Sequence, residues 1–265
     1  MEKFILYLKK QNLSTNTINT YVYGVEYFIN NYKINSHNLL AYKGYLLETF
    51  KPKTVNLRIH SINKYLDFIN KKELKIHSIK IQNKTYLENV ISNADYVFLK
   101  KSLKRMKNYK WYFIVWFLAA TGARVSELIK VKVEHIKLEY FDIYSKGGKL
   151  RRLYLPKKLT DAINVWLKQE GKKSGYIFTN KLSQPISTRA ISQQLKKIAR
   201  KLGIDQNVVY PHSFRHLFAK NFLERFNDIS LLADLMGHES IETTRIYLRR
   251  SSSEQKQIVD DVIDW

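Results

Sequence analysis

The 265-residue chain contains no cysteine, so it can form neither a disulfide bond nor a metal site built on thiolate ligands. It also lacks the run of about 20 apolar residues that a membrane span needs. The longest apolar run, residues 111–120, is half that length and predicts a buried helix. The first residues, beginning Met1-Glu2-Lys3, lack the long apolar core and cleavage site of a signal peptide. We therefore expect a soluble, cytoplasmic protein.

Acidic residues are scarce: 23 Asp and Glu stand against 46 Lys and Arg, which gives a net charge of +23. This excess indicates a polyanionic partner, either nucleic acid or an anionic membrane surface. A compositional bias toward Lys, Asn and Ile would produce part of it without any ligand. Residues 1–84 carry a net charge of +9 and residues 85–247 a net charge of +15, whereas residues 248–265 carry −1. A polyanion could therefore be held from two sides.

Two common types of phosphate chemistry have no sequence signal here. The chain has no G-x-x-x-x-G-K-[S/T] loop for a nucleotide. It also has no acidic trio suited to two-metal cleavage, because the clustered acids Asp260, Asp261 and Asp264 stand outside the basic part of the chain. Chemistry on a phosphate would thus have to proceed without metal ions.

The N-terminal part has the periodicity of helices. Apolar residues recur at helical spacing after Ser14, a good N-cap, and again after Pro52, with a shorter candidate helix at residues 38–49. Such a pattern predicts a small helical bundle. The lysine-rich, weakly periodic segment 71–84 indicates a connection to the rest of the chain. We expect a bundle at residues 1–80, a linker at 81–87 and a second domain at 88–265 with a tail at 248–265.

The second part predicts a mixed domain. Ser92 and Asp95 form a capping box that begins a helix. Apolar and polar residues alternate on both sides of Gly147-Gly148, which predicts a β-hairpin. The remainder, residues 158–265, is mainly helical by period. The expected fold class is therefore mainly α with a small antiparallel β-sheet: an N-terminal helical bundle followed by a mixed α/β domain.

A cluster of chemically useful residues follows Pro211, which can begin a helix. His212, Arg215 and His216 would then stand on one helix face. Guanidinium and imidazole groups both donate hydrogen bonds to phosphate oxygens, so this face favours an anion. The alternatives are an exposed helix face without function, or zinc held by His212 and His216. The zinc alternative lacks the base of His-Glu-x-x-His helices, because Ser213 follows the first histidine.

A second cluster lies closer to the C-terminus. Gly237 is placed to cap one helix and His238 follows it, while Ser240 can cap a short helix that carries Tyr247. With 18 tyrosines in the chain, a tyrosine at helical spacing is by itself usually a core residue. The combination of Gly-His with a tyrosine nine residues after the histidine is what distinguishes Tyr247.

Two further cations stand upstream. Arg124 lies in residues 121–128 (TGARVSEL), three residues before Glu127, with which an ion pair is expected. Lys146 lies in the predicted hairpin loop. Three other basic residues lie close to it in the sequence: Lys149, Arg151 and Arg152. Of these, Lys149 is the main alternative to Lys146.

Together these segments resemble the signature of the tyrosine recombinase (phage-integrase-type) family, in its simpler, Xer-like form without an arm-binding domain. The resemblance covers residues 88–250 and extends more weakly to the bundle, which is similar to the family's core-site-binding domain. One departure is Phe214, where leucine is common, and we expect no consequence from it.

The resemblance implies a metal-independent enzyme that cleaves and rejoins double-stranded DNA at specific core sites through a 3′-phosphotyrosyl intermediate, with no cofactor and no metal. Tyr247 would be the nucleophile, and Arg124 and Arg215 would clamp the phosphate oxygens. Because an unperturbed tyrosine has a pKa near 10, nearby cations would have to help it ionise.

The resemblance also assigns the remaining groups. His212 and His238 would donate hydrogen bonds to the phosphate, His212 would take the tyrosine proton, and Lys146 would be the general acid. The tail, residues 248–265, would dock on a neighbouring protomer and link a homo-tetramer on DNA, although it could instead fold back on its own domain. Two alternatives stay open: a type IB topoisomerase that relaxes DNA as a monomer, and a non-catalytic DNA-binding relative.

Overall fold

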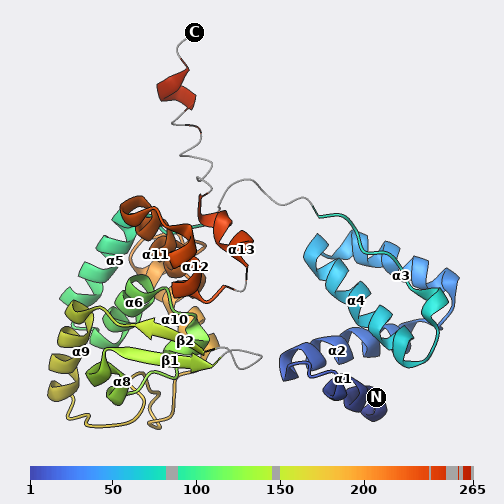
Figure 1. The fold of residues 1–265 in the computed structure, drawn as a ribbon, viewed down its shortest axis with the longest axis horizontal. Coiled ribbons are helices and arrows are strands. Elements are labelled where there is room, and N and C mark those ends of the chain that lie inside the picture. The colour runs from blue at the N-terminus through green and yellow to red at the C-terminus, as the bar shows by residue number, and fades with distance from the viewer. Residues whose placement is uncertain (82–88, 145–149, 239, 249–255, 257–258, 264–265) are drawn as a thin grey trace. The chain divides into compact units, whose positions relative to one another are not determined.

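The computed structural model describes residues 1–81, 89–144, 150–238, 240–248, 256 and 259–263. The chain divides into two compact units, Met1–Asn83 and Lys84–Trp265, coloured blue to cyan and green to red in Figure 1. In the described part of the chain the fold is mainly helical with one two-stranded antiparallel sheet, which confirms the predicted fold class. No helix in this part is long and apolar enough to cross a membrane.

The first unit is a helical bundle. Its elements are α1 (Glu2–Lys10), α2 (Thr15–Asn31), α3 (Ser36–Thr49), α4 (Pro52–Phe68) and the 3₁₀ turn η1 (Lys72–Leu74). The predicted start of α2 is confirmed, because Ser14 Oγ accepts a hydrogen bond from Thr17 N at 3.2 Å. Each helix turns its apolar stripe toward one shared core, which includes Phe4, Val25, Phe28, Leu39, Tyr42, Ile59, Ile62 and Leu66.

The lysine-rich segment after η1 is more ordered than its composition suggests. The side-chain amide of Asn63 both donates to Ile76 O (2.8 Å) and accepts from Ile76 N (3.1 Å). Asn56 makes the same pair of bonds with the backbone of Ile79 (2.9 and 2.8 Å). Both asparagines lie on α4, so their side chains hold the backbone of this stretch alongside the helix. Residues 75–81 are therefore held against α4, although their lysine-rich composition taken alone indicated a connection.

The second unit surrounds α6 (Tyr109–Thr121), the helix formed by the long apolar run. Most of its residues are buried, as predicted, and α5 (Asn93–Arg105) and α11 (Pro211–Phe226) pack along it (Figure 1). Ser92 caps α5, which confirms that prediction. The other described helices are α7 (Val125–Leu128), α8 (Val133–Leu138), α9 (Lys157–Gln169), α10 (Thr188–Lys201), α12 (Ile229–Met236), α13 (Ile241–Arg245) and the 3₁₀ turn η2 (Ile246–Leu248).

The predicted hairpin is formed by β1 (Tyr140–Tyr144) and β2 (Leu150–Tyr154), which pair antiparallel with Tyr140 opposite Tyr154. Side chains of a strand alternate between its two faces. Arg151 is therefore buried, whereas its neighbour Arg152 is exposed. The connecting loop, with Lys146 and Lys149, lies outside the described residues.

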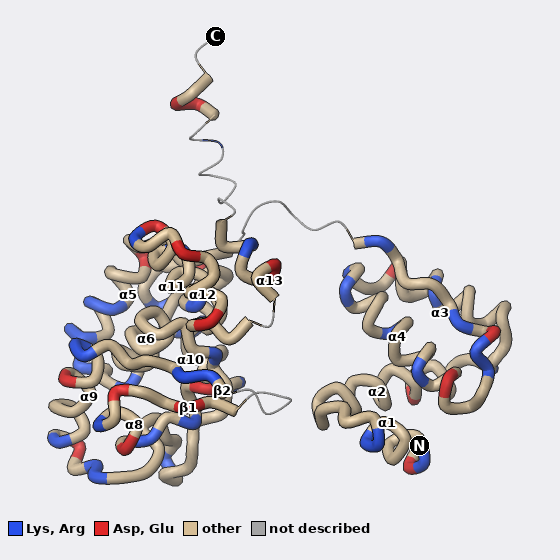
Figure 2. Tube along the Cα trace, viewed as in Figure 1, with Lys and Arg blue, Asp and Glu red and all other residues tan. Residues whose placement is uncertain are grey.

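Lysine and arginine occur throughout both units. Figure 2 shows them on the helices of each unit, mixed with fewer acidic residues. The charge excess that the sequence indicated is thus shared by the two units rather than confined to one tail or loop.

Candidate active site

The site is organised around the end of α12. This helix ends at Gly237, whose left-handed φ of +61° favours glycine. A Cβ there would also lie 2.3 Å from Cδ of Arg151, so no side chain fits. The backbone N–H groups of Gly237 and His238 turn back onto earlier carbonyls of the helix, at 3.0 Å each. The next three carbonyls, those of Leu235, Met236 and Gly237, remain open to other donors.

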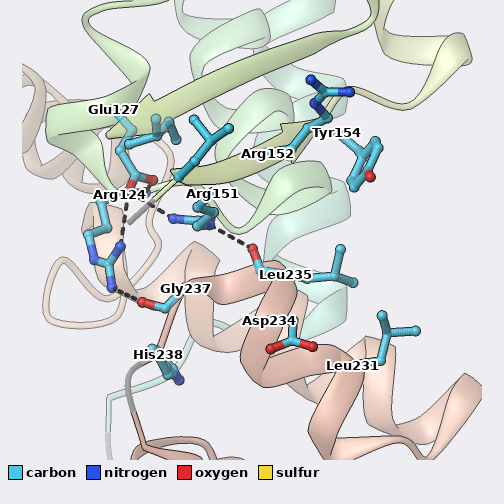
Figure 3. Close-up of a pocket in the computed structure, with 12 residues that line it drawn as sticks. Arg124, Glu127, Arg151, Arg152, Tyr154, Leu231, Asp234, Leu235, Gly237 and His238 are labelled. Carbon is cyan, nitrogen blue, oxygen red and sulfur yellow. Dashed lines mark hydrogen bonds and ion pairs between the residues drawn. The ribbon is translucent and has the colours of Figure 1, made fainter. Parts of the chain in front are cut away.

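Three arginines from three different elements occupy these carbonyls, and Figure 3 shows two of the contacts. The pairs are Arg151 Nε to Leu235 O (2.9 Å), Arg215 Nη2 to Met236 O (2.7 Å) and Arg124 Nη2 to Gly237 O (3.2 Å). A helix C-terminus carries a partial negative charge. The end of α12 therefore both spaces the three guanidinium groups and offsets part of their repulsion.

Arg215 is the most deeply placed of the three, with only 2% of its surface exposed. Its Nη1 donates to the carbonyl of Gly122 at 2.6 Å. Gly122 is itself in the left-handed conformation that ends α6, and a Cβ there would lie 2.4 Å from the Phe218 ring. Burial lowers the pKa of Arg215 to about 10, with a smaller contribution from the charge of Arg124. The guanidinium thus stays charged at neutral pH.

Glu127 supplies the counter-charge. Its Oε2 accepts from Arg124 N at 2.7 Å, and its Oε1 accepts from Arg124 Nη1 at 3.0 Å, which confirms the expected ion pair. The same Oε1 also accepts from Arg151 Nη1 at 2.8 Å. An open pocket of about 610 Å³ lies beside these groups, with Arg124, Arg151 and His238 in its lining. The sequence marked Arg151 only as one of several basic residues near the hairpin loop.

His238 connects Arg215 to the next short helix. Its Nε2 lies 2.9 Å from Arg215 Nη2, and its Nδ1 lies 2.8 Å from Thr244 Oγ1. Arginine can only donate, so Nε2 accepts and the ring proton resides on Nδ1. Burial and the charges of Arg215, Arg124 and Arg151 lower the pKa of His238 to about 4. In this arrangement the ring is neutral, and Nε2 is engaged by Arg215.

Tyr247 lies on η2 and is buried, with 7% of its surface exposed. The His238 ring stacks against it at 6.1 Å between centroids, and Nε2 of the same histidine lies 2.9 Å from Arg215 Nη2. Burial raises the pKa of Tyr247 more than the charges of Arg215 and Arg124 lower it. The sequence suggested that cations would promote its ionisation; because desolvation outweighs them, the phenol is neutral at pH 7 and needs a base.

Two histidines on α11 flank these groups. His212 is exposed in the first turn, and desolvation together with the charges of Arg215 and Arg124 lowers its pKa, so the ring is neutral at pH 7. The His216 ring lies 5.3 Å from that of Tyr247, its Nδ1 is buried without a hydrogen-bond partner, and its pKa falls to about 4 through burial. Among the described residues, no three His, Asp or Glu side chains gather as a metal site would require.

The structure thus brings five of the six candidate residues into one cluster, and the sixth, Lys146, lies outside the described residues. The cluster has two arginines that can hold phosphate oxygens, a neutral phenol beside them and a neutral imidazole nearby. Sequence reasoning did not anticipate the buried Arg151 or the position of His216 against the tyrosine ring. The five clustered residues are Arg124, His212, Arg215, His238 and Tyr247.

Comparison with known proteins points to a single family. Residues 99–254 of this chain match the sequence pattern of the phage integrase family. Tyrosine recombinase XerA of Pyrococcus furiosus is 30% identical over an alignment of 273 residues, which covers 98% of this chain and 92% of the relative.

Solved structures share the fold over nearly the whole chain. XerH site-specific recombinase bound to its difH substrate, in a pre-cleavage complex, matches with a TM-score of 0.70 at 20% identity, covering 91% of this chain and 79% of that one. A lambda integrase dimer bound to a COC′ core site matches with a TM-score of 0.72 at 14% identity, covering 93% of each chain.

Proposed function

Because this chain belongs to the phage integrase family and is a tyrosine site-specific DNA recombinase, we propose that Tyr247 is the residue with which it cleaves DNA. The observation that carries this assignment is the packing of Tyr247 against the His238 ring, whose Nε2 lies 2.9 Å from Arg215 Nη2 within the arginine cluster. A phosphate bound by Arg215 would lie next to the phenol. Of the alternatives drawn from the sequence, recombination is favoured because the full-length relatives are recombinases.

In the proposed step, the Tyr247 oxygen attacks the phosphorus atom while the bond from phosphorus to the 5′-oxygen breaks. Arg124 and Arg215 neutralise the non-bridging oxygens as charge develops on them. The phenol proton passes to His212, which is neutral at pH 7 because its pKa is lowered. The leaving 5′-oxygen takes a proton from Lys146. The phosphotyrosyl bond keeps the energy of the cleaved linkage, so rejoining needs no nucleotide cofactor.

His238 has a different starting role from the one that the family resemblance implies. Its Nε2 accepts from Arg215 in the arrangement described above, so we propose that it first holds Arg215 in place. It becomes a donor to the phosphate only after Arg215 has turned toward the phosphate oxygens and the ring proton has shifted from Nδ1 to Nε2, with the Thr244 hydroxyl then donating to Nδ1. This order gives one ring two successive hydrogen-bonding roles.

A nicked suicide substrate tests the nucleophile. Cleavage beside the nick releases a short fragment, so the covalent complex cannot be rejoined and accumulates as a slowly migrating band. We expect Tyr247→Phe to bind DNA with wild-type affinity and to form no such band, because the ring remains but the attacking atom is gone. Tyr210→Phe, which alters a tyrosine outside the cluster of five, serves as the matched control and should form the band. Adduct formation by Tyr247→Phe would overturn the assignment.

We also propose that residues 1–80 form the core-site DNA-binding bundle and that residues 248–265 link four protomers on DNA. Support for the second point is the apolar surface of the only acidic segment: Val259, Val262 and Ile263 are each about half exposed. Residues 249–255, 257–258 and 264–265 of the tail lie outside the described residues. Truncation after Ser251 should leave a DNA-binding protein that fails to complete strand exchange. Recombination at wild-type yield would contradict this.

A further inference from the structure

Arg151 is a buried cation to which the proposed cleavage step gives no role. Only 8% of its side chain is exposed, the same fraction as for its partner Glu127. Burying a guanidinium costs several kcal/mol unless hydrogen bonds compensate. The neighbouring Arg152 avoids that cost, because it lies on the exposed face of β2 and forms two hydrogen bonds with Asp142. The burial of Arg151 is therefore specific to its position.

The contacts of Arg151 join three separate elements. From β2, its Nε reaches the carbonyl of Leu235 at the end of α12, and its Nη1 reaches Glu127 Oε1 on α7. That oxygen also accepts from Arg124 Nη1. The two arginines thus share one carboxylate oxygen, so displacing Arg151 would change the direction in which Glu127 holds Arg124.

The close approach of Arg151 to Gly237 adds a second constraint. Because a Cβ at Gly237 would collide with Arg151 Cδ, this turn passes directly against the arginine side chain. The Gly237 carbonyl accepts from Arg124, and His238 follows immediately. Arg151 therefore contacts both supports of Arg124, the carboxylate on one side and the turn on the other (Figure 3).

We propose that Arg151 is a positioning residue: it fixes Glu127 and the end of α12 so that Arg124 and the Gly237-His238 turn keep the spacing that a phosphate requires. This inference rests on the function proposed above for the same site. Arg151 acts on Arg124 through these neighbours. A planar guanidinium is suited to this task because it donates in two fixed directions at once, whereas a lysine ammonium cannot reproduce both contacts.

The test compares Arg151→Met and Arg151→Lys with Arg152→Met in the full-length protein. Single-turnover cleavage of the nicked suicide substrate is measured at saturating DNA, and DNA affinity and the thermal midpoint are measured in parallel. We expect both Arg151 variants to cleave about 10²-fold more slowly at unchanged DNA affinity, since a small misplacement of a catalytic group has an effect of this size. Arg152→Met should cleave at the wild-type rate.

Two measurements separate positioning from a merely structural role. In a double-mutant cycle, Arg151→Lys should add little to the slowing caused by Glu127→Gln, because both changes release the same carboxylate contact. Methylguanidinium should accelerate Arg151→Ala and leave Arg152→Ala unchanged. If Arg151→Met does not fold, Arg151→Lys and the rescue experiment decide.

Wild-type cleavage by a folded Arg151 variant would overturn the inference, and so would additive effects with Glu127→Gln together with no rescue. Failure of the proposed function would be recognised separately, because the wild-type protein would then form no adduct that depends on Tyr247.

Discussion

The two units carry the same kind of charge in opposite ways. In the first unit, Lys and Arg surround an apolar and aromatic core, and none of its described charged residues is buried as a whole, although Nη1 of Arg58 is enclosed. The second unit buries charge. Glu127, Arg151 and Arg215 are the buried charged residues in the described part of the chain: both arginines donate to carbonyls at the end of α12, and Glu127 accepts from Arg151.

We propose that the surface charges bind DNA and that the buried charges take part in its cleavage. Surface charges keep their hydration and are screened by salt, so they are suited to general electrostatic binding of a polyanion. Buried charges cost free energy and persist only where several partners fix them. Net charge therefore indicated the polyanionic partner, whereas buried charge marks the cluster at which we propose that the chemistry occurs. The contrast can be tested by changing one kind of charge at a time.

The largest effect should come from a change that keeps the charge of the buried cluster but alters its shape. Arg215→Lys retains a cation yet loses the fork that reaches Gly122 and Met236. Arginines that clamp a transferring phosphoryl group are worth about 10³–10⁵ in rate. We expect single-turnover cleavage to slow by about 10³-fold or more with little change in DNA affinity. A loss below about tenfold would mean that charge alone suffices.

The next effect concerns stability and compares two ion pairs. Glu127→Gln removes the carboxylate that faces Arg124 and Arg151, and breaking such a buried pair should lower the free energy of unfolding by about 3 kcal/mol. Asp142→Asn breaks the more exposed pair with Arg152 and should lower the free energy of unfolding much less, because solvent screens that pair. Urea unfolding of both variants provides the measurement. Equal losses would remove the distinction between buried and surface charge.

Salt dependence tests the surface charges of the first unit. The logarithm of DNA affinity falls by about 0.9 for each neutralised phosphate per logarithmic unit of salt. Because residues 1–84 carry a net charge of +9, removing residues 1–83 should flatten this slope as well as weaken binding. Circular dichroism of the shortened chain checks that the second unit remains folded. An unchanged slope would show that the bundle does not contact DNA.

The smallest effect should be that of pH near neutrality. The pKa values of His212, His216 and His238 are all lowered, and that of Tyr247 is raised. None of these groups changes charge between pH 7 and 8, so the cleavage rate should be nearly constant there. The base must be unprotonated, so the rate should fall by about tenfold per pH unit once the pH drops below the lowered pKa of His212. A fall beginning above pH 6.5 would rule out His212 as the base.

The sequence predicted those features that depend on neighbouring residues. Pro211 begins α11 and places His212 and Arg215 in its first turns, while Gly237 ends α12 in the left-handed conformation. Both depend on local backbone preferences, which a short segment specifies completely. The resemblance to a known family then placed Arg124 in the same site, although it is far away in the sequence.

Features that depend on distant contacts could not be predicted in this way. Arg151 stands among basic residues that look equivalent, and its burial follows from Glu127 and the end of α12 meeting the inner face of β2. Burial raises the pKa of Tyr247, whereas the sequence suggested that nearby cations would lower it. Likewise, Asn56 and Asn63 form hydrogen bonds with the backbone of residues 76 and 79, in a segment whose lysines suggested a linker.

The most direct test of the account is to identify the residue joined to DNA. Wild-type protein trapped on the nicked suicide substrate would be digested with nuclease and protease, and the modified peptide sequenced by mass spectrometry. The account predicts that the nucleotide is attached through its 3′-phosphate to Tyr247. Attachment to any other residue, or through a 5′-phosphate, would contradict it.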